Sequence, residues 1–347
     1  MATYEEAKHI VASYNGKPIR IMEVCGTHTH ETFRLGIRKL LPPNIELVSG
    51  PGCPVCVTPV SFIDEALWLA LERKVTVCTF GDLLRVPGTT MTLSEARGRG
   101  ARVEIVYAPR DAYEYAAVHR NEDIVFLSVG FETTTPASCL AVTEAKKAGL
   151  TNFSILTANK TMPNAYEAMW RSCDAFLYPG HVHAVIGTSL CRKLAQRGIS
   201  GVVAGFTAKE LITALVYIIK QMPKGNPFFT NCYPRVVRPE GSPKGRAIVA
   251  AVMESCDTQW RGLGMIPLSG MKLRADYAAF DSRTKYDIPF LEGREDPACR
   301  CGDVLQGKCK PTECAVFGKG CTPEHAVGAC MVSNEGTCAA FYRYGGI

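Results

Sequence analysis

The sequence predicts an α/β protein built from two related open parallel-sheet domains and a small cysteine-rich domain. Three features support this prediction: short β-branched runs alternate with helical patterns, linkers rich in Gly and Pro divide the chain, and cysteines gather toward its end. Alternating strands and helices are typical of parallel sheets covered by helices. The expected strands are nearly continuous apolar runs, as in strands that are buried on both faces.

The strands and helices are expected in succession along the chain. Strands are expected at residues 18–24, 45–49, 75–80, 102–107, 123–129, 153–158, 175–178, 201–206 and 246–253. Helical patterns lie near residues 61–73, 92–99, 111–120, 136–148, 163–171, 184–197 and 208–221. A single barrel is the alternative, but the uneven strand count and the linkers near 130–136 and 222–245 favour two open domains. The Pro-Gly turns in SGPGCPVC and YPGHVH suggest that the two halves are related.

Composition and charge exclude several classes of protein. With 47% hydrophobic and 21% charged residues, the chain of 347 residues is typical of a folded protein of two or three domains. The net charge of +6 is not gathered in a Lys/Arg stripe, so we expect no nucleic-acid partner. The N-terminal residues lack a signal-peptide pattern, and no apolar run is long enough to span a membrane. A cytoplasmic location is therefore expected.

The 16 cysteines indicate metal binding or thiol redox chemistry, because structural disulfides are rare in a reducing compartment. Free cysteine also packs as a small hydrophobic residue. We assign that structural role to the six scattered cysteines, Cys78, Cys139, Cys173, Cys191, Cys232 and Cys256.

The first candidate site is MEVCGTHTH, which follows a predicted strand directly and contains Cys25 and His28. Loops at the carboxyl ends of parallel strands line the ligand crevice of open α/β sheets. A thiol beside an imidazole can be held as a thiolate, and the same pair can bind a metal such as iron. The alternative is a buried cysteine next to a turn-forming histidine.

The second candidate site is Cys53-Pro54-Val55-Cys56 in a Gly/Pro loop after the next strand, with Thr58 as an expected N-cap and Pro59 as the first helical residue. A thiol at a helix N-terminus is made more acidic by the unpaired N–H groups and the helix dipole. Thiol–disulfide chemistry is the favoured role. Metal ligation remains open, although no second motif nearby completes a zinc site.

Two further loops follow predicted strands. In YPGHVH, His181 and His183 could face one pocket, and His181 is favoured because it follows the Pro-Gly turn directly. Either histidine could instead be a structural hydrogen-bond donor. The polar loop from Phe131 to Pro136 could line the same crevice, but capping of the next helix is the commoner role.

The strongest pattern is the group of seven cysteines at the end of the chain, where strand patterns fade and Gly and Pro rise. They are Cys299, Cys301, Cys309, Cys314, Cys321, Cys330 and Cys338. A segment this short often needs a metal or cross-links to fold. Four thiolates suffice for a 4Fe–4S cluster, and others could form a redox pair beside it. A zinc site is the competing metal assignment.

The segments MEVCGTHTHE, SGPGCPVCVTP, YPGHVHAVIG and the cysteine-rich tail resemble the HypD family of hydrogenase maturation factors, over essentially the whole chain. The resemblance implies α/β domains at residues 16–130 and 131–268, and a 4Fe–4S domain formed by residues 1–15 and 269–347. It also implies partners. With the small chaperone HypC, such a protein holds iron while HypE, charged by HypF, delivers cyanide. Iron with two cyanides and one carbonyl then passes to the large subunit of a nickel–iron hydrogenase.

The resemblance also implies roles for the motif residues. Cys25 is expected to ligate iron, with His28 as its proton-handling neighbour, and Cys53 and Cys56 are expected to form a thiol–disulfide pair. The family spacing Cys-x14-Cys-x6-Cys-x16-Cys assigns the cluster ligands to Cys299, Cys314, Cys321 and Cys338, a redox pair to Cys301 and Cys330, and no role to Cys309. Electrons are expected to pass from the cluster through the second pair to the first. The rival hypotheses are a cluster-dependent protein disulfide reductase and a zinc-stabilised scaffold.

Overall fold

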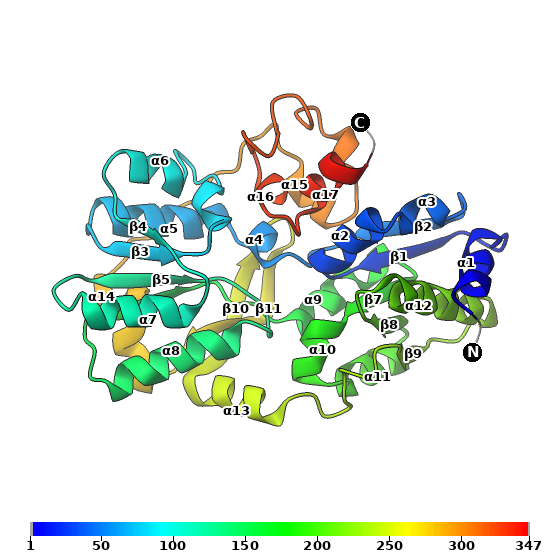
Figure 1. The fold of residues 1–347 in the computed structure, drawn as a ribbon, viewed down its shortest axis with the longest axis horizontal. Coiled ribbons are helices and arrows are strands. Elements are labelled where there is room, and N and C mark those ends of the chain that lie inside the picture. The colour runs from blue at the N-terminus through cyan, green and yellow to red at the C-terminus, as the bar shows by residue number, and fades with distance from the viewer. Residues whose placement is uncertain (1–2, 346–347) are drawn as a thin grey trace.

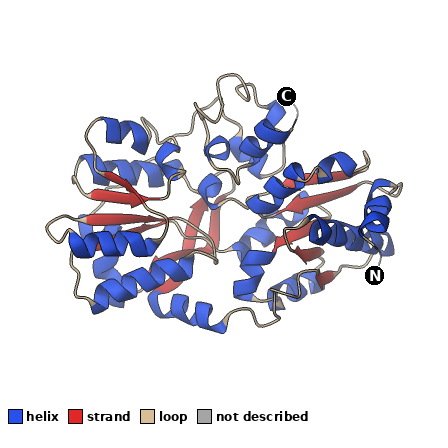
Figure 2. Cartoon of the chain, viewed as in Figure 1, coloured by secondary structure: helices blue, strands red, loops and turns tan. Residues whose placement is uncertain are grey.

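The computed structural model describes residues 3–345 and contains two parallel sheets and an antiparallel hairpin (Figures 1 and 2). Sheet A has the strand order β2-β1-β7-β8-β9 and sheet B the order β4-β3-β5-β6. The strands are β1 (Ile19–Glu23), β2 (Ile45–Ser49), β3 (Thr76–Thr79), β4 (Val103–Ile105), β5 (Ile124–Ser128), β6 (Phe153–Thr157), β7 (Ala175–Pro179), β8 (Gly201–Ala204) and β9 (Phe229–Asn231). The hairpin pairs β10 (Met253–Trp260) with β11 (Gly264–Leu273).

Helices cover both sheets. They are α1 (Tyr4–Ala12), α2 (Gly26–Arg34), α3 (Ile37–Leu40), α4 (Pro54–Val57), α5 (Val60–Leu71), α6 (Leu93–Gly98), α7 (Pro109–Val118), α8 (Thr135–Lys147), α9 (Met162–Met169), α10 (Gly180–Ile186), α11 (Ser189–Gln196), α12 (Ala208–Gln221), α13 (Pro243–Val252), α14 (Ser282–Tyr286), α15 (Cys301–Leu305), α16 (Ala329–Val332) and α17 (Thr337–Tyr344). Short 3-10 turns are η1 (Leu83–Arg85), η2 (Trp170–Ser172), η3 (Met222–Lys224), η4 (Ala275–Phe280) and η5 (Pro311–Glu313). None of these helices is long and apolar enough to cross a membrane.

The α/β class with two open parallel sheets is confirmed. Every residue of β5, β6 and β7 is buried, as expected for strands covered on both faces. If the strands of each sheet are numbered in chain order, sheet A has the order 2-1-3-4-5 and sheet B the order 2-1-3-4. The two sheets are therefore related in topology. Helices begin where the sequence supplies caps: Thr92 and Thr207 each form a capping box with the glutamate three residues later.

The expected domain boundary at residues 130/131 cuts across both sheets. Strands β1 and β2 share sheet A with β7, β8 and β9, whereas β6 pairs with β5 in sheet B. The chain thus forms two of the five strands of sheet A, then the four strands of sheet B, and then returns to complete sheet A. Parallel strands need long crossovers, so the sequence does not dictate which strand the next one joins.

Residues 1–15 were expected to complete the cysteine-rich domain, but helix α1 packs on sheet A instead. Its buried residues Ala7 and Val11 share a core with Leu211 and Leu215 of α12. The cysteine-rich module is therefore formed by the end of the chain alone. It lies over the middle of the molecule, between the two sheets (Figure 1).

Two expected elements were wrong. The strand expected at 246–253 is helix α13, which Ser242 caps; a short apolar run fits either structure. The helix expected at 184–197 is broken into α10 and α11 at Gly187. That glycine has φ 79°, and a Cβ there would lie 2.3 Å from the Pro239 carbonyl oxygen.

One apolar core joins the two sheets, the hairpin and the cysteine-rich module. It includes Met22 of sheet A, Leu127 of sheet B, Trp260 of the hairpin, and Cys301 and Cys330 of the module. The strand carboxyl ends of both sheets point toward this shared core (Figure 1). The ligand crevices of the two sheets therefore face each other.

Lys160, just after β6, is a buried cation with a testable energetic consequence. Burial, assisted by Arg283, lowers the pKa of its ammonium group to about 7. Between pH 7 and about 10 the unfolded chain binds a proton that the folded chain does not, so stability rises with pH in that window. We expect Lys160→Met to raise the free energy of unfolding by up to about 4–5 kcal/mol at pH 7 and below, which is the penalty for charging the buried amine.

This advantage should shrink as the pH rises and disappear above about 10.5, where both states hold a neutral amine. Denaturant unfolding of the two proteins at several pH values measures it. Lys146→Met, at a cation that also lies over an aromatic ring but is exposed, is the control. A pH-independent difference between Lys160→Met and the parent would contradict the expected titration.

Candidate functional site

The candidate site lies where the strand order of sheet A reverses. Strands β1 and β7 are neighbours, with β2 beyond β1 and β8 beyond β7. Ligands of open α/β sheets bind at the carboxyl ends of strands at such a point. Cys25 follows β1 and His181 follows β7, so two motifs that are far apart in the sequence meet at one crevice.

Cys25 is the N-cap of α2, and two glycines pack the CPVC loop directly against it. The Gly26 N–H donates to the Gly52 carbonyl at 3.0 Å, and a Cβ on Gly52 would lie 2.2 Å from the Cys25 nitrogen. Only glycine at position 52 permits this approach. The expected association of the first two motifs is therefore present.

The Cys25 thiol is held in its protonated form. Burial and the negative charge of Glu335 raise its pKa to about 12, although N–H groups of His28 and Thr27 oppose the shift. In this structure, shielding from water and the nearby carboxylate outweigh the stabilisation that a neighbouring imidazole can give to a thiolate. An arriving cation would have to replace this proton, which suits a thiol that becomes a ligand only when metal is delivered.

His28 is completely buried and its orientation is defined by one bond. Its Nε2–H donates to the Gly205 carbonyl at 3.0 Å, and Nδ1 has no hydrogen-bond partner among residues 3–345. Burial lowers the pKa of the ring to about 4, so His28 is neutral and Nδ1 is a free acceptor. The ring centroid lies 4.7 Å from that of Phe206, which stacks on His181 at 3.9 Å.

The two histidines of YPGHVH do not share a pocket, because α10 turns them in different directions. His183 is buried: its Nδ1–H donates to the Gly187 carbonyl at 2.8 Å, and its Nε2 accepts from Tyr166 at 3.3 Å. It is a structural residue of the core. His181 is exposed and belongs to the Cys25 crevice through Phe206, which the sequence did not single out.

Three hydroxyl groups and one guanidinium hold Glu23, which is completely buried two residues before Cys25. Thr29 and Thr32 donate to its carboxylate at 2.9 and 2.7 Å. Ser49 donates at 3.4 Å, and Arg38 forms an ion pair with it. The threonines of CGTHTHET therefore anchor α2 to the end of β1, which places Cys25 and His28.

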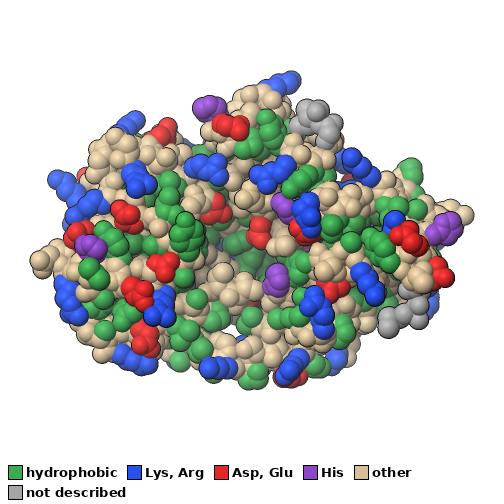
Figure 3. Space-filling view, viewed as in Figure 1, with side chains coloured by type: hydrophobic (Ala, Val, Ile, Leu, Met, Phe, Trp, Pro, Cys, Tyr) green, Lys and Arg blue, Asp and Glu red, His purple; other side chains and the backbone are tan. Residues whose placement is uncertain are grey.

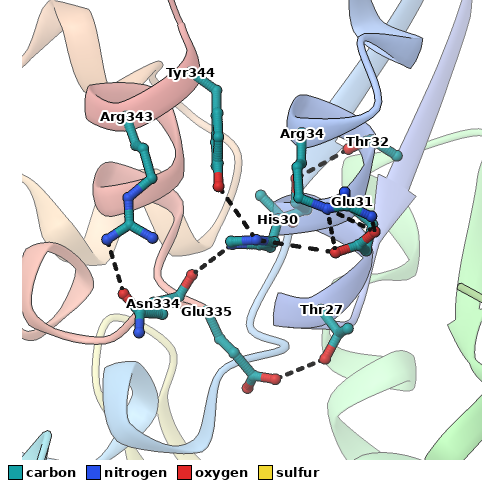
Figure 4. Close-up of polar contacts among 10 residues, drawn as sticks. Thr27, His30, Glu31, Thr32, Arg34, Asn334, Glu335, Arg343 and Tyr344 are labelled. Carbon is teal, nitrogen blue, oxygen red and sulfur yellow. Dashed lines mark hydrogen bonds and ion pairs between the residues drawn. The ribbon is translucent and has the colours of Figure 1, made fainter.

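The cysteine-rich module closes the crevice through Asn334 and Glu335 (Figure 4). Thr27 donates its hydroxyl hydrogen to Glu335 at 2.6 Å, and His30 Nδ1–H donates to the Asn334 carbonyl at 3.3 Å. A Cβ on Gly26 would lie 2.6 Å from the Glu335 Cβ. Sequence reasoning missed these contacts because more than 300 residues separate the partners.

The CPVC segment forms its own short helix, α4. Cys53 is the N-cap, and its sulfur accepts from the Cys56 N–H at 3.3 Å; Pro54 is the first helical residue. A cysteine at a helix N-terminus was expected, but Thr58 and Pro59 have other roles. Thr58 ends α4, and Pro59 precedes α5.

The four cysteines of the two expected redox pairs follow one another in space through the core. Helix α4 packs on α16, where the Cys56 thiol faces the Ala329 carbonyl at 3.9 Å and lies beside Cys330. The Sγ atoms of Cys330 and Cys301 are 2.8 Å apart. The order Cys53, Cys56, Cys330, Cys301 is thus an uninterrupted series of thiols, which we call the thiol series.

We expect mild oxidation of the metal-free chain to join Cys301 to Cys330, because their sulfurs are already in contact. Two of the 16 thiols should then resist alkylation, and peptide mapping without reductant should recover the linked pair. Cys78 and Cys139, which are buried away from this series, should remain free as internal controls. Full alkylation of Cys301 after oxidation would contradict the prediction.

The four expected cluster ligands gather around the turn before α16. Cys314, Cys321 and Cys338 share a small core with Phe317 and Met331. Cys299 packs against Gly328 so closely that a Cβ added to this glycine would lie 2.6 Å from the Cys299 sulfur. Among residues 3–345, no three potential ligands stand close enough to hold a metal ion as placed. Ligation of a cluster would require these thiols to close in.

The donor set nevertheless fits an anionic cluster. The Val327 N–H donates to the Cys321 sulfur at 3.3 Å. Arg261 is 4% exposed, its Nε donates to the Thr58 carbonyl at 2.9 Å, and its Nη2 has no partner among the described residues. Its charge opposes the rise in the pKa of Cys299 and of Cys301. A buried, incompletely paired cation beside thiols is matched by a group of negative charge.

The remaining cysteines divide as follows. Cys309 lines a cleft of about 500 Å³ along β2, apart from the thiol series, and the expected absence of a site role stays a prediction. The expected structural role is confirmed for Cys78, Cys139 and Cys191, which are completely buried. Cys173, Cys232 and Cys256 are only partly buried.

Fold and site together define a two-sheet α/β protein with a thiol crevice closed by a cysteine-rich module. A sequence model of the HypD family, described as the hydrogenase formation hypA family, matches residues 2–345. The chain is 43% identical to the hydrogenase maturation factor HypD of Rhodobacter capsulatus over 340 residues, which cover 95% of this chain and 90% of the relative. It is 42% identical to hydrogenase maturation factor HypD of Escherichia coli K12, with 98% and 92% covered. The chain belongs to the HypD family of hydrogenase maturation factors.

Proposed function

We propose that this protein is the scaffold on which the iron of a nickel–iron hydrogenase receives two cyanide ligands and one carbonyl. Family membership supports a role in hydrogenase maturation. The observation that carries the finer proposal is the contact between the Cys25 loop and the CPVC loop at the switch point of sheet A. It places a potential iron ligand beside a potential redox pair.

In this proposal iron is the substrate, and Cys25 binds it together with a cysteine of the chaperone HypC. The free Nδ1 of neutral His28 receives the proton that the Cys25 thiol gives up. Thiolate is a soft ligand, which suits ferrous iron that carries cyanide. HypE, charged by HypF, supplies the cyanide, and the large subunit of the hydrogenase receives the product.

The thiol series supports transfer of two electrons by disulfide exchange. Cys330 attacks Cys56 of a Cys53–Cys56 disulfide, releases the Cys53 thiol, and forms a mixed disulfide. Cys301 then attacks Cys330 and releases Cys56. The first pair is reduced by two electrons and two protons, and the Cys301–Cys330 pair is oxidised to the same extent.

A 4Fe–4S cluster is proposed for Cys299, Cys314, Cys321 and Cys338, and when bound it supplies the single electrons that restore the second thiol pair. Arg261 balances its negative charge. We expect Arg261→Met to lower the midpoint potential of the reconstituted cluster, because the reduced form loses more stabilisation than the oxidised form.

A redox titration followed by electron paramagnetic resonance measures this shift. Arg261, Arg294 and Cys299 line one cleft, and Arg294 is exposed. Arg294→Met is therefore the matched control. An unchanged potential in Arg261→Met would contradict the charge-balancing role. A protein that binds zinc and no iron would contradict the cluster and favour a zinc-stabilised scaffold.

Infrared spectroscopy of the protein purified anaerobically with HypC tests the function itself. Bands in the cyanide and carbonyl stretching region are the expected result. The thiol series also fits a cluster-dependent protein disulfide reductase, which would leave Cys25 without a role. Full iron content without those bands, in cells with active hydrogenase, would favour the reductase.

A further inference from the structure

A cavity of about 350 Å³ lies between α10, α13 and the hairpin β10–β11. Its walls are mainly apolar and include Val185, Ile186, Val249, Met253 and Met271. The space-filling view is open in this region, at the lower middle of the molecule (Figure 3). No cysteine or histidine among residues 3–345 lines the cavity, so it is separate from the thiol series.

Glu132, from the loop after β5, is the buried polar side chain of this cavity. It is 8% exposed, and its Oε1 accepts from the Met162 N–H at 2.9 Å, so it caps α9 and not α8, the next helix. Its Oε2 has no hydrogen-bond partner among the described residues. Burial raises the pKa of the carboxyl to about 7. A buried carboxyl oxygen without a partner is costly, so an N–H or O–H group that enters the cavity would be stabilised there.

Arg246, on α13, supplies positive charge at the cavity mouth. It is exposed, its Nη1 donates to the Ile186 carbonyl at 3.2 Å, and within residues 3–345 it forms no ion pair with a carboxylate. Arg274, which also lines the cavity, is already paired with Glu254 at 3.8 Å. Arg246 is therefore the cation available to an incoming anion.

We propose that this cavity binds a small organic carboxylate with a hydrogen-bond donor at its other end. The carboxylate of the ligand pairs with Arg246, and its carbon chain packs along Val185, Val249 and Met271. Its donor group forms a hydrogen bond with the unpaired Oε2 of Glu132. The volume is near the lower limit of ligand sites, about 300–1,000 Å³, so the ligand is of amino-acid size. This site is independent of the proposed role in iron ligand assembly.

Two probes differ only in the donor and therefore test the assignment: 5-hydroxypentanoate and pentanoate. At pH 8 or above, where Glu132 is mostly ionised, we expect the full-length protein to bind the hydroxy acid about tenfold more tightly, because a hydrogen bond to a charged acceptor discriminates by about that factor. Isothermal titration calorimetry measures both affinities. Equal affinities, or no binding of either probe, would overturn the proposal and leave Oε2 to a buried water.

Variants separate the parts of the site. Glu132→Gln should reduce the preference for the hydroxy acid, because a neutral amide replaces the charged acceptor, and Arg246→Met should weaken both probes. Ala250→Trp should exclude both, because Ala250 lines the cavity at an exposed position where a larger side chain does not disturb the core. Arg110→Met, at an exposed arginine of α7, is the control and should bind like the parent. Undiminished binding by folded Ala250→Trp would place the probes elsewhere and overturn the assignment.

Discussion

Cys25→Ser is expected to abolish the infrared bands of iron-bound cyanide and carbonyl while leaving iron and sulfide of the tail cluster unchanged. A hydroxyl is a hard, weakly acidic ligand and does not replace a thiolate on ferrous iron. The substitution removes one sulfur atom from a buried position and leaves the packing of Gly26 and Gly52 in place. Loss of the bands would therefore report lost ligation and not a lost fold.

The matched control is Cys191→Ser, at a buried cysteine that also lies beside a histidine, His183, but outside the crevice. It should retain the bands. Cys56→Ser should retain a fully bound cluster and keep Cys301 and Cys330 as reduced thiols, because no Cys53–Cys56 disulfide can form to oxidise them. If Cys25→Ser kept the bands, or lost the cluster together with them, Cys25 could not be a separate iron site.

The sequence predicted the motif loops well because each follows a buried strand, and strand ends at a parallel sheet edge bring such loops together. Cys25, Cys53 and His181 were placed in this way. Strand partners could not be predicted. The return of the chain to β1 through β7 depends on packing across long crossovers, and local sequence does not encode it.

The contributions that sequence reasoning missed come from distant segments with no motif of their own. Phe206 links His28 to His181, and Glu335 reaches Cys25 from the other end of the chain. Glu132 stood in a loop that was singled out, but its cavity arises only where α10, α13 and the hairpin meet. Helix α13 was itself misread as a strand, so that cavity was invisible from the sequence.

The buried pair of Glu23 and Arg38 explains why so many polar residues surround Cys25, and it predicts a large loss of stability. Glu23 is completely buried, and Arg38 also donates to the Leu47 carbonyl at 2.6 Å. Arg38→Met would leave an uncompensated carboxylate in the core. We expect a loss of about 3–5 kcal/mol in the free energy of unfolding, measured by denaturant titration.

Arg34→Met is the matched control, because Arg34 pairs with Glu31 three residues before it and its side chain is 50% exposed. That exposed pair should contribute less than about 1 kcal/mol. The double variant Glu23→Leu/Arg38→Met should recover most of the loss, since both charges are removed together. Yet its infrared bands should stay weak, because Thr29 and Thr32 would no longer anchor α2 and hold Cys25 at the end of β1. Equal stability of Arg38→Met and Arg34→Met would mean that water, and not Arg38, compensates Glu23.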